Sequence, residues 1–363
     1  MTAREIMMAD RFTVGLFSLN ASGGVAMTTV PERWRAEWND IRAVVQIADS
    51  AGLDFLLPLQ RWRGYGGESD PRGVCMETMT HAAALVGITS RISLFATAQT
   101  SILHPTWTAR ALATIDHASG GRAGLNIVCG WNEHDFAMFG AQDVGADRRY
   151  DQGIEWTEIF SRQIRGDPPF DFAGKYFSIT GAYSSPASIQ PGGPPLMSAT
   201  FSPAGRTFAA QFCDVLFTTI SSIDNAARHA AAIQEEAARY QRRIRVLTPL
   251  HVVCRPTTSE AEAYYKRYAT DYADAGAVEN YIAENARSGK PALAVAMRMQ
   301  KKRISGGFGS FGISGSPRDI ADQFVELKRA GLHGVSLSFV NFLDELPYFL
   351  EAVMPLLESA GLR

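Results

Sequence analysis

The sequence predicts an α/β protein whose fold is a (β/α)8 (TIM) barrel with insertions at the carboxyl-terminal face. Strand-like and helix-like patterns alternate from one end of the chain to the other. We count eight strand patterns, whereas a doubly wound sheet would normally stop sooner. The chain has 363 residues, of which 46% are hydrophobic and 20% charged. This composition suits one large core, so we expect a single domain over 1–363.

The predicted strands are short and apolar, as is typical of strands covered on both faces. They span 12–19, 55–59, 92–97, 123–129, 196–200, 215–218, 246–253 and 335–339. The predicted helices have apolar residues at three- and four-residue spacing. They span 34–50, 76–87, 109–117, 147–165, 202–212, 224–239, 259–272, 317–330 and 343–357.

Three insertions are expected, near 131–147, 167–190 and 273–315. In the second insertion, FDFAGKYFSI has a glycine between two aromatic-rich arms, which predicts a hairpin laid over the end of the barrel. We expect the third insertion to be irregular and glycine-rich at its end.

The segment 106–140 carries the strongest local signal. Gly120 and Gly121 end a helix, because leaving a helix usually requires a residue at positive φ. Asn126 is the polar exception in the strand that follows, so it is either a satisfied core group or a ligand contact. A polar and aromatic run that includes Trp131 comes after this strand, at the end where parallel α/β folds carry their chemistry.

Composition argues against several functional classes. Lys plus Arg is 35 and Asp plus Glu is 37, so the net charge is −2, which does not favour nucleic acid or an anionic membrane as partner. The four cysteines are far apart, and the histidines form no H-x-H or H-E-x-x-H pattern. We therefore expect no metal site and a reduced, cytoplasmic protein. The charged first residues and the lack of an apolar run of about 20 residues predict neither a leader nor a membrane span.

Residues 307–312 spell G-x-G-x-x-G, but they follow KKRIS instead of an apolar strand. A dinucleotide site has no scaffold there, and a mobile loop over 306–315 that would act as a lid is the preferred interpretation. The run from Arg63 to Gly67 lacks the Gly-Lys-Ser/Thr ending of a phosphate loop.

Two positions could bind an anion. Ser202 begins a helix whose first turn holds Gly205, so it is either a plain N-cap or part of an anion cradle. Arg148 and Arg149 precede Tyr150 in the first turn of another helix, where positive charge opposes the helix dipole. They are either a solvated pair or the two sides of an anion site.

Taken together, these residues resemble the bacterial-luciferase-like flavin monooxygenases, over about 12–357. Within that family, the resemblance is to the group with pyrimidine, dimethylsulfone and dibenzothiophene-sulfone monooxygenases. The matching segments are Gln60 to Gly67, Ser90 to Thr97, Ala113 to Asp116, Gly121-Arg122, Asn126 to Trp131 and Arg149-Tyr150.

The resemblance implies a (β/α)8 barrel that uses O2 and reduced FMN, the latter supplied by a separate flavin reductase. It implies a flavin peroxide as the oxidant of a small organic substrate such as an N-heterocycle, a sulfone or an aromatic compound. It also implies a homodimer or homotetramer. The implied flavin contacts are Gln60, Arg61, Asn126, Asp135, Arg149, Tyr150 and Ser202.

Further roles follow from the same resemblance. Thr97 and Asn126 would hold O2 beside the flavin, Trp131 and Phe17 would form walls that keep water out, and Asn20 would face the substrate. His104, which precedes a proline at a helix start, is either an acid/base or a structural residue.

The chain departs from its relatives at Ala199-Thr200-Phe201-Ser202, where they have a glycine, and at Cys129, where they have Thr or Ser. These departures argue against assuming uracil as substrate. Two alternatives remain open: a deazaflavin-dependent reductase or dehydrogenase on the same barrel, and a non-catalytic flavin-binding protein.

Overall fold

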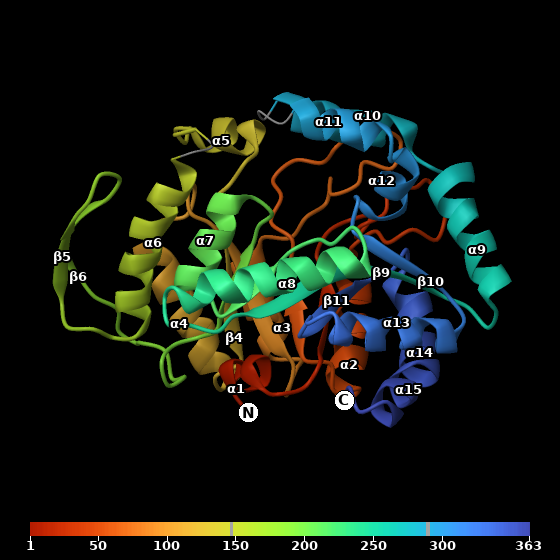
Figure 1. Cartoon of the computed structure of the whole chain (residues 1–363). Helices are drawn as coiled ribbons and strands as arrows, with labels where there is room; N and C mark the ends of the chain where they lie inside the picture. Colours follow the sequence, from red (N-terminus) through yellow and green to blue (C-terminus); the bar gives the residue numbers. More distant parts are fainter. Residues whose placement is uncertain (146–147, 288–290) are drawn as a thin grey trace.

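The computed structural model describes residues 1–145, 148–287 and 291–363. Its centre is a closed barrel of eight parallel strands, which confirms the predicted fold (Figure 1). Each barrel strand pairs with the next barrel strand along the chain, and the last barrel strand pairs with the first. The barrel strands are β1 (Thr13–Phe17), β2 (Phe55–Leu57), β3 (Ser93–Gln99), β4 (Ala123–Val128), β7 (Leu196–Ala199), β8 (Val215–Phe217), β9 (Arg245–Cys254) and β11 (Gly334–Ser338).

Helices surround this barrel. They are α2 (Trp38–Ser50), α3 (Thr78–Val86), α4 (Pro105–Ser119), α6 (Arg149–Ile164), α7 (Pro203–Phe212), α8 (Ile223–Ala238), α9 (Thr258–Lys266) with the π-helical η1 (Arg267–Asp271), α13 (Pro317–Arg329), α14 (Phe342–Ala352) and α15 (Met354–Ser359). The predicted start of one helix at Asp147 lies outside the described residues. None of the described helices is long and apolar enough to cross a membrane.

A short helix that the sequence did not predict, α1 (Ala3–Met8), lies at the amino-terminal end of the barrel. Its Met7 is fully buried and belongs to the cluster inside the barrel. Both chain termini lie at this end in Figure 1, opposite to the helices of the first and third insertions. The amino-terminal end is thus closed, and the carboxyl-terminal end is the one left for a site.

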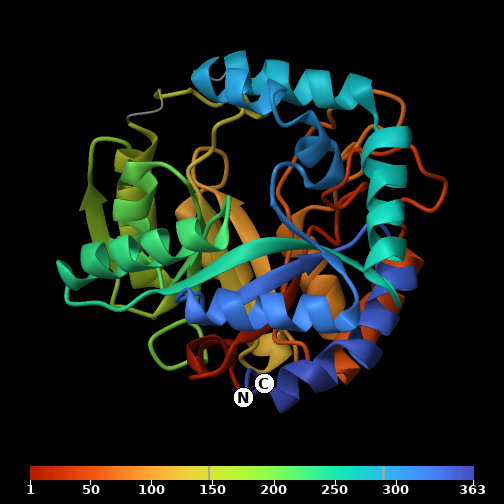
Figure 2. The same ribbon diagram turned by 45° about the vertical axis from the view of Figure 1, so that its right-hand side comes forward.

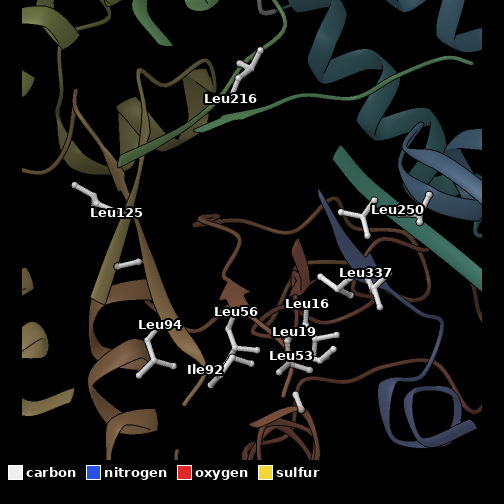
Figure 3. Close-up of a cluster of buried hydrophobic side chains, with 14 of the residues drawn as sticks. Leu16, Leu19, Leu53, Leu56, Ile92, Leu94, Leu125, Leu216, Leu250 and Leu337 are labelled. Atoms are coloured by element: carbon white, nitrogen blue, oxygen red, sulfur yellow. The ribbon is translucent and has the colours of Figure 1, made fainter. Parts of the chain in front are cut away.

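Side chains alternate between the two faces of each strand, as the period of two requires. The outward set packs under the helices; Figure 3 shows Leu16, Leu94, Leu125 and others of this core. The inward set is led by aromatic rings, and glycines make room for them. A Cβ on Gly15 would lie 2.5 Å from the Phe55 ring, so only glycine fits there.

The first two insertions contain regular structure. Residues 131–147 include α5 (Glu133–Phe139), and 167–190 include the antiparallel pair β5 (Phe170–Ala173) and β6 (Ser178–Ala182). The hairpin is confirmed, but its expected place over the barrel end is wrong. It packs on the outer side of α6 through Ile159, with the Arg162 guanidinium 3.4 Å above the Phe170 ring (Figure 1).

The expectation that 273–315 is irregular is also wrong. The described part holds α10 (Ala275–Arg287), α11 (Pro291–Arg298), α12 (Lys301–Gly307) and the strand β10 (Phe311–Gly315). The supposed loop over 306–315 therefore consists of the end of α12, a turn over 308–310 and the strand β10, so it is not an irregular loop. Figure 1 and Figure 2 show α10 and α11 spanning the carboxyl-terminal end of the barrel.

Strand β9 changes neighbours along its length. It pairs with β8 from Arg245 to Leu247 and with β10 from Leu250 to Cys254, while β11 pairs along its middle. Because a strand has two edges and β11 occupies one of them, β8 and β10 follow one another along the other edge. This leaves a seam between the end of β8 and the start of β10.

Candidate functional site

The centre of the candidate site is the pair Thr97 and Asn126 inside the barrel, which are register partners on β3 and β4. Asn126 Nδ2 donates a hydrogen bond to Thr97 Oγ1 (3.2 Å), and Thr97 Oγ1 donates to the Pro58 carbonyl (2.8 Å). Asn126 is only 4% exposed, and its Oδ1 has no hydrogen-bond partner among the described residues. A buried acceptor without a partner is costly, so Asn126 is a candidate ligand contact.

Gln60, three residues after the end of β2, forms hydrogen bonds that hold Thr97 in place. Its amide nitrogen donates to Thr78 Oγ1 (2.9 Å) and to the Thr97 carbonyl (3.2 Å), and its oxygen accepts from Trp62 Nε1 (3.2 Å). Thr78 Oγ1 in turn donates to the Thr97 carbonyl (2.7 Å). Gln60 therefore fixes the end of β3.

A second group of polar atoms lies at the amino end of α7. We call Tyr150, Thr200 and Ser202 the hydroxyl cluster. Tyr150 Oη and Thr200 Oγ1 are 2.8 Å apart, and Ser202 Oγ donates to Tyr150 Oη (3.3 Å) while accepting from the Gly205 amide (3.1 Å). A Cβ on Gly205 would lie 1.7 Å from Thr200 Oγ1, so only glycine allows this approach. Three hydroxyls at the amino end of a helix suit a phosphate.

Arg149 lies next to this cluster in the chain but is already paired. Its Nε and Nη2 donate to the two carboxylate oxygens of Asp143 (3.0 and 2.7 Å). The hydrogen bonds from Arg149 hold the pKa of Asp143 below its usual value. The guanidinium also lies 5.3 Å from the Phe136 ring. An anion that binds Arg149 would therefore compete with a carboxylate.

A buried charge cluster joins the first and third insertions. Arg61 Nη2 donates to both oxygens of Glu284 (2.6 and 2.8 Å), and Asn132 Nδ2 donates to the same carboxylate. Asp135 is 4% exposed, its Oδ1 has no hydrogen-bond partner among the described residues, and burial raises its pKa. The sequence offered no signal for Glu284, because it lies in a segment expected to be irregular.

Aromatic rings dock the third insertion onto the loop after β2. The Tyr65 ring lies 5.0 Å from that of Tyr281 and 5.5 Å from that of Phe308. The Arg72 guanidinium lies 3.7 Å above Phe308. Trp131 is half-buried, with the Arg61 guanidinium 5.6 Å from its ring. These contacts hold α10 to α12 over the carboxyl-terminal end of the barrel.

Two expected site residues have other partners. Asn20 is fully buried; its Nδ2 donates to the Leu59 and Met76 carbonyls (2.8 and 2.9 Å), and its Oδ1 accepts from the Leu59 amide (2.8 Å). His104 is exposed and caps α4, its Nδ1 accepting from the Thr106 amide (3.3 Å). The contacts of both side chains are therefore structural.

Phe17, which was expected to form a wall of the site, and Cys129 lie at the carboxyl ends of the barrel strands β1 and β4. Phe17 ends β1 inside the barrel, and its ring lies 5.2 Å from that of Phe217 at the end of β8. Cys129 is buried, which raises the pKa of its thiol to about 12, so the thiol is uncharged at neutral pH. The described residues contain no cluster of three metal-ligating side chains.

Comparison with known proteins places the chain in a family. A family model described as luciferase-like monooxygenase matches residues 12–334. Pyrimidine monooxygenase RutA of Enterobacter sp. (strain 638) is 30% identical over 359 residues, which cover 95% of this chain and 96% of that protein. Riboflavin lyase RcaE, solved with modified FMN and riboflavin, superposes with a TM-score of 0.85 at 25% identity, covering 97% of this chain and 92% of RcaE.

DmoA from Hyphomicrobium sulfonivorans has the same fold, with a TM-score of 0.85 at 19% identity over 97% of this chain and 89% of DmoA. The family resemblance predicted from the sequence is thus confirmed. The chain belongs to the luciferase-like monooxygenase family.

Proposed function

We propose that this protein is a two-component monooxygenase that uses reduced FMN and O2 to oxidise a small organic substrate, such as an N-heterocycle, a sulfone or an aromatic compound. The observation that carries the proposal is the unpartnered, buried Asn126 Oδ1 beside Thr97 at the carboxyl ends of β3 and β4. Membership of the monooxygenase family and the likeness to RutA support it.

The residues present fit FMN. The hydroxyl cluster and the amino end of α7 would hold its phosphate, because hydroxyls and helix N–H groups donate to oxyanions. Asn126 Oδ1 and Asp135 Oδ1 are buried acceptors without a hydrogen-bond partner in the described part of the chain, and they would take donor groups of the cofactor. Bound reduced FMN would supply the electrons that the activation of O2 requires.

Thr97 acts on the reaction through Asn126. Its hydroxyl proton is directed to the Pro58 carbonyl, so its oxygen accepts from Asn126 and orients that amide. The second N–H of Asn126 would then donate to negative charge that develops on dioxygen. The helices held over the barrel by Tyr65 and Phe308 would limit the access of water.

The test is a reconstituted reaction with FMN, a flavin reductase, NADH and O2, assayed by oxygen uptake and product analysis. We expect saturable FMN binding and substrate-dependent product formation, with Asn126→Ala lowering the yield of product per NADH. Hydrogen peroxide alone across a broad substrate panel would refute the proposal. Preferred binding of the deazaflavin coenzyme would favour the reductase alternative, and tight FMN binding without oxygen uptake would favour a non-catalytic flavoprotein.

We further propose that a flavin reductase supplies the cofactor by diffusion and that the chain assembles as a homodimer or homotetramer. Light scattering of the full chain tests the assembly. Replacing the reductase with chemically reduced FMN tests the supply route, since turnover without the reductase would show that no complex is needed.

A further inference from the structure

A pocket lies at the seam where the pairing partner of β9 changes from β8 to β10. Its volume is about 350 Å³. It is bounded by the loop after β8, the carboxyl half of β9, β10 and the end of α12. Figure 2 shows α12 above the carboxyl half of β9. Since the barrel strands are parallel and the pocket lies along the carboxyl half of β9, it is at the same end of the barrel as Asn126.

Among the described residues, Arg303 is the one charged residue that lines this pocket, and none of the acidic residues does. Its Nη2 donates to the Ile220 carbonyl (2.8 Å) and its Nε to the Ser310 carbonyl (3.2 Å). These neutral acceptors hold the guanidinium in place without neutralising it. Arg303 is half-buried, and this burial lowers its pKa. A desolvated cation without a counterion is stabilised by an anion.

His251 contributes no charge to the pocket. Its Nδ1 lies 3.2 Å from Ser338 Oγ and its Nε2 lies 2.9 Å from Tyr268 Oη. Burial lowers the pKa of His251 to about 3, so the ring is neutral in the physiological range. Arg303 is therefore the source of positive charge among the described residues that line the pocket.

Ser314 provides an independent observation. Its hydroxyl is buried and has no hydrogen-bond partner among the described residues, although it lines the same pocket as Arg303. The rest of the wall includes Val253, Phe311 and Ile313, which are apolar. The pocket thus combines a fixed cation, an unused hydroxyl donor and an apolar wall.

We propose that this pocket binds an organic carboxylate with an apolar or aromatic body, its carboxylate held by Arg303 and Ser314. This proposal names organic carboxylates as the substrate class of the proposed monooxygenase. In that respect it rests on the proposed function. Anion binding itself needs neither flavin nor O2, so the two proposals can fail separately.

The test uses naphthalene-1-carboxylate and the matching naphthalene-1-carboxamide as probes, titrated calorimetrically into the full flavin-free chain. We expect the carboxylate to bind at least tenfold tighter than the carboxamide. Arg303→Gln removes this preference, Arg303→Lys keeps part of it, and Lys302→Gln leaves it unchanged. Lys302 is the matched control because it carries the same charge one position earlier on α12 but does not line the pocket.

Ser314→Ala decides the case if Arg303→Gln proves poorly folded. The unpartnered hydroxyl contributes no hydrogen bond to the free protein, so its loss should leave the thermal unfolding temperature unchanged and weaken carboxylate binding severalfold. Equal binding of the two probes, no carboxylate binding at millimolar concentration, or an equal loss in Lys302→Gln would overturn the proposal. Normal carboxylate binding in a protein that shows no monooxygenase activity would retain the pocket and reject only the proposed reaction.

Discussion

Two buried asparagines in this barrel should respond to truncation in opposite ways. Asn20 makes three hydrogen bonds to backbone atoms, whereas Asn126 makes one to Thr97 and leaves its Oδ1 without a partner. A hydrogen bond contributes about 1 kcal/mol net, and an unsatisfied buried acceptor costs about 1–3 kcal/mol. Asn20→Ala should therefore lower the free energy of unfolding by about 3 kcal/mol. In Asn126→Ala the lost bond and the relieved penalty nearly cancel.

Urea denaturation of the two flavin-free variants measures this difference, with FMN titration of each as the second readout. We expect Asn126→Ala to unfold within about 1 kcal/mol of the wild type but to bind FMN at least tenfold more weakly. Asn20→Ala should show the reverse pattern. If Asn126→Ala is as destabilised as Asn20→Ala, Asn126 is an ordinary, satisfied core residue and not a ligand contact.

Three further predictions follow from the polar groups at the carboxyl-terminal face. Glu284→Gln leaves a buried guanidinium without its carboxylate and should cost about 3 kcal/mol in urea denaturation, whereas Glu279→Gln, whose partner Lys301 is half-exposed, should cost under about 1 kcal/mol. Tyr150→Phe should weaken FMN binding about tenfold in fluorescence titration but leave riboflavin binding unchanged, and an equal loss for both would contradict a phosphate contact. Burial raises the pKa of Asp135 above its ordinary value. Between the pKa of the unfolded chain and that of the folded protein, Asp135 is protonated only in the folded protein. The free energy of unfolding therefore falls as the pH rises through this range. Asp135→Asn should therefore gain stability over the wild type at pH 7 and not below about pH 3.8, as measured by unfolding at both pH values.

The sequence was informative where the chemistry is local. Apolar patterning predicted the eight strands, and the N-cap pattern at Ser202 predicted the helix start beside which the hydroxyl cluster forms. The part of the cluster that depends on Thr200 was not predicted. In the sequence, Thr200 is only the residue that stands where the relatives have a glycine. In the folded protein its hydroxyl lies 2.8 Å from Tyr150 Oη.

The missed features depend on long-range contacts or on the backbone. Arg61 and Glu284 are separated by 223 residues, so no local pattern connects them. Strand β10 reads FGISG and pairs with β9 through its backbone, which requires no alternation of side chains. Asn20 shows a related limit, since a sequence does not reveal whether a buried amide has partners.

The arginine closest in sequence to the hydroxyl cluster gives a prediction that separates two ways of holding a phosphate. Arg149 is paired with Asp143, whose side chain is one-third exposed, so binding Arg149 to a phosphate requires breaking that pair. If this exchange occurs, Asp143→Asn removes the competitor and should tighten FMN binding about two- to tenfold, a range set by the modest strength of a partly exposed ion pair. Riboflavin, which has no phosphate, is the control and should bind unchanged. If Asp143→Asn instead weakens FMN binding, the pair acts as a unit that positions the first turn of α6, and the phosphate is held by hydroxyls and helix N–H groups alone.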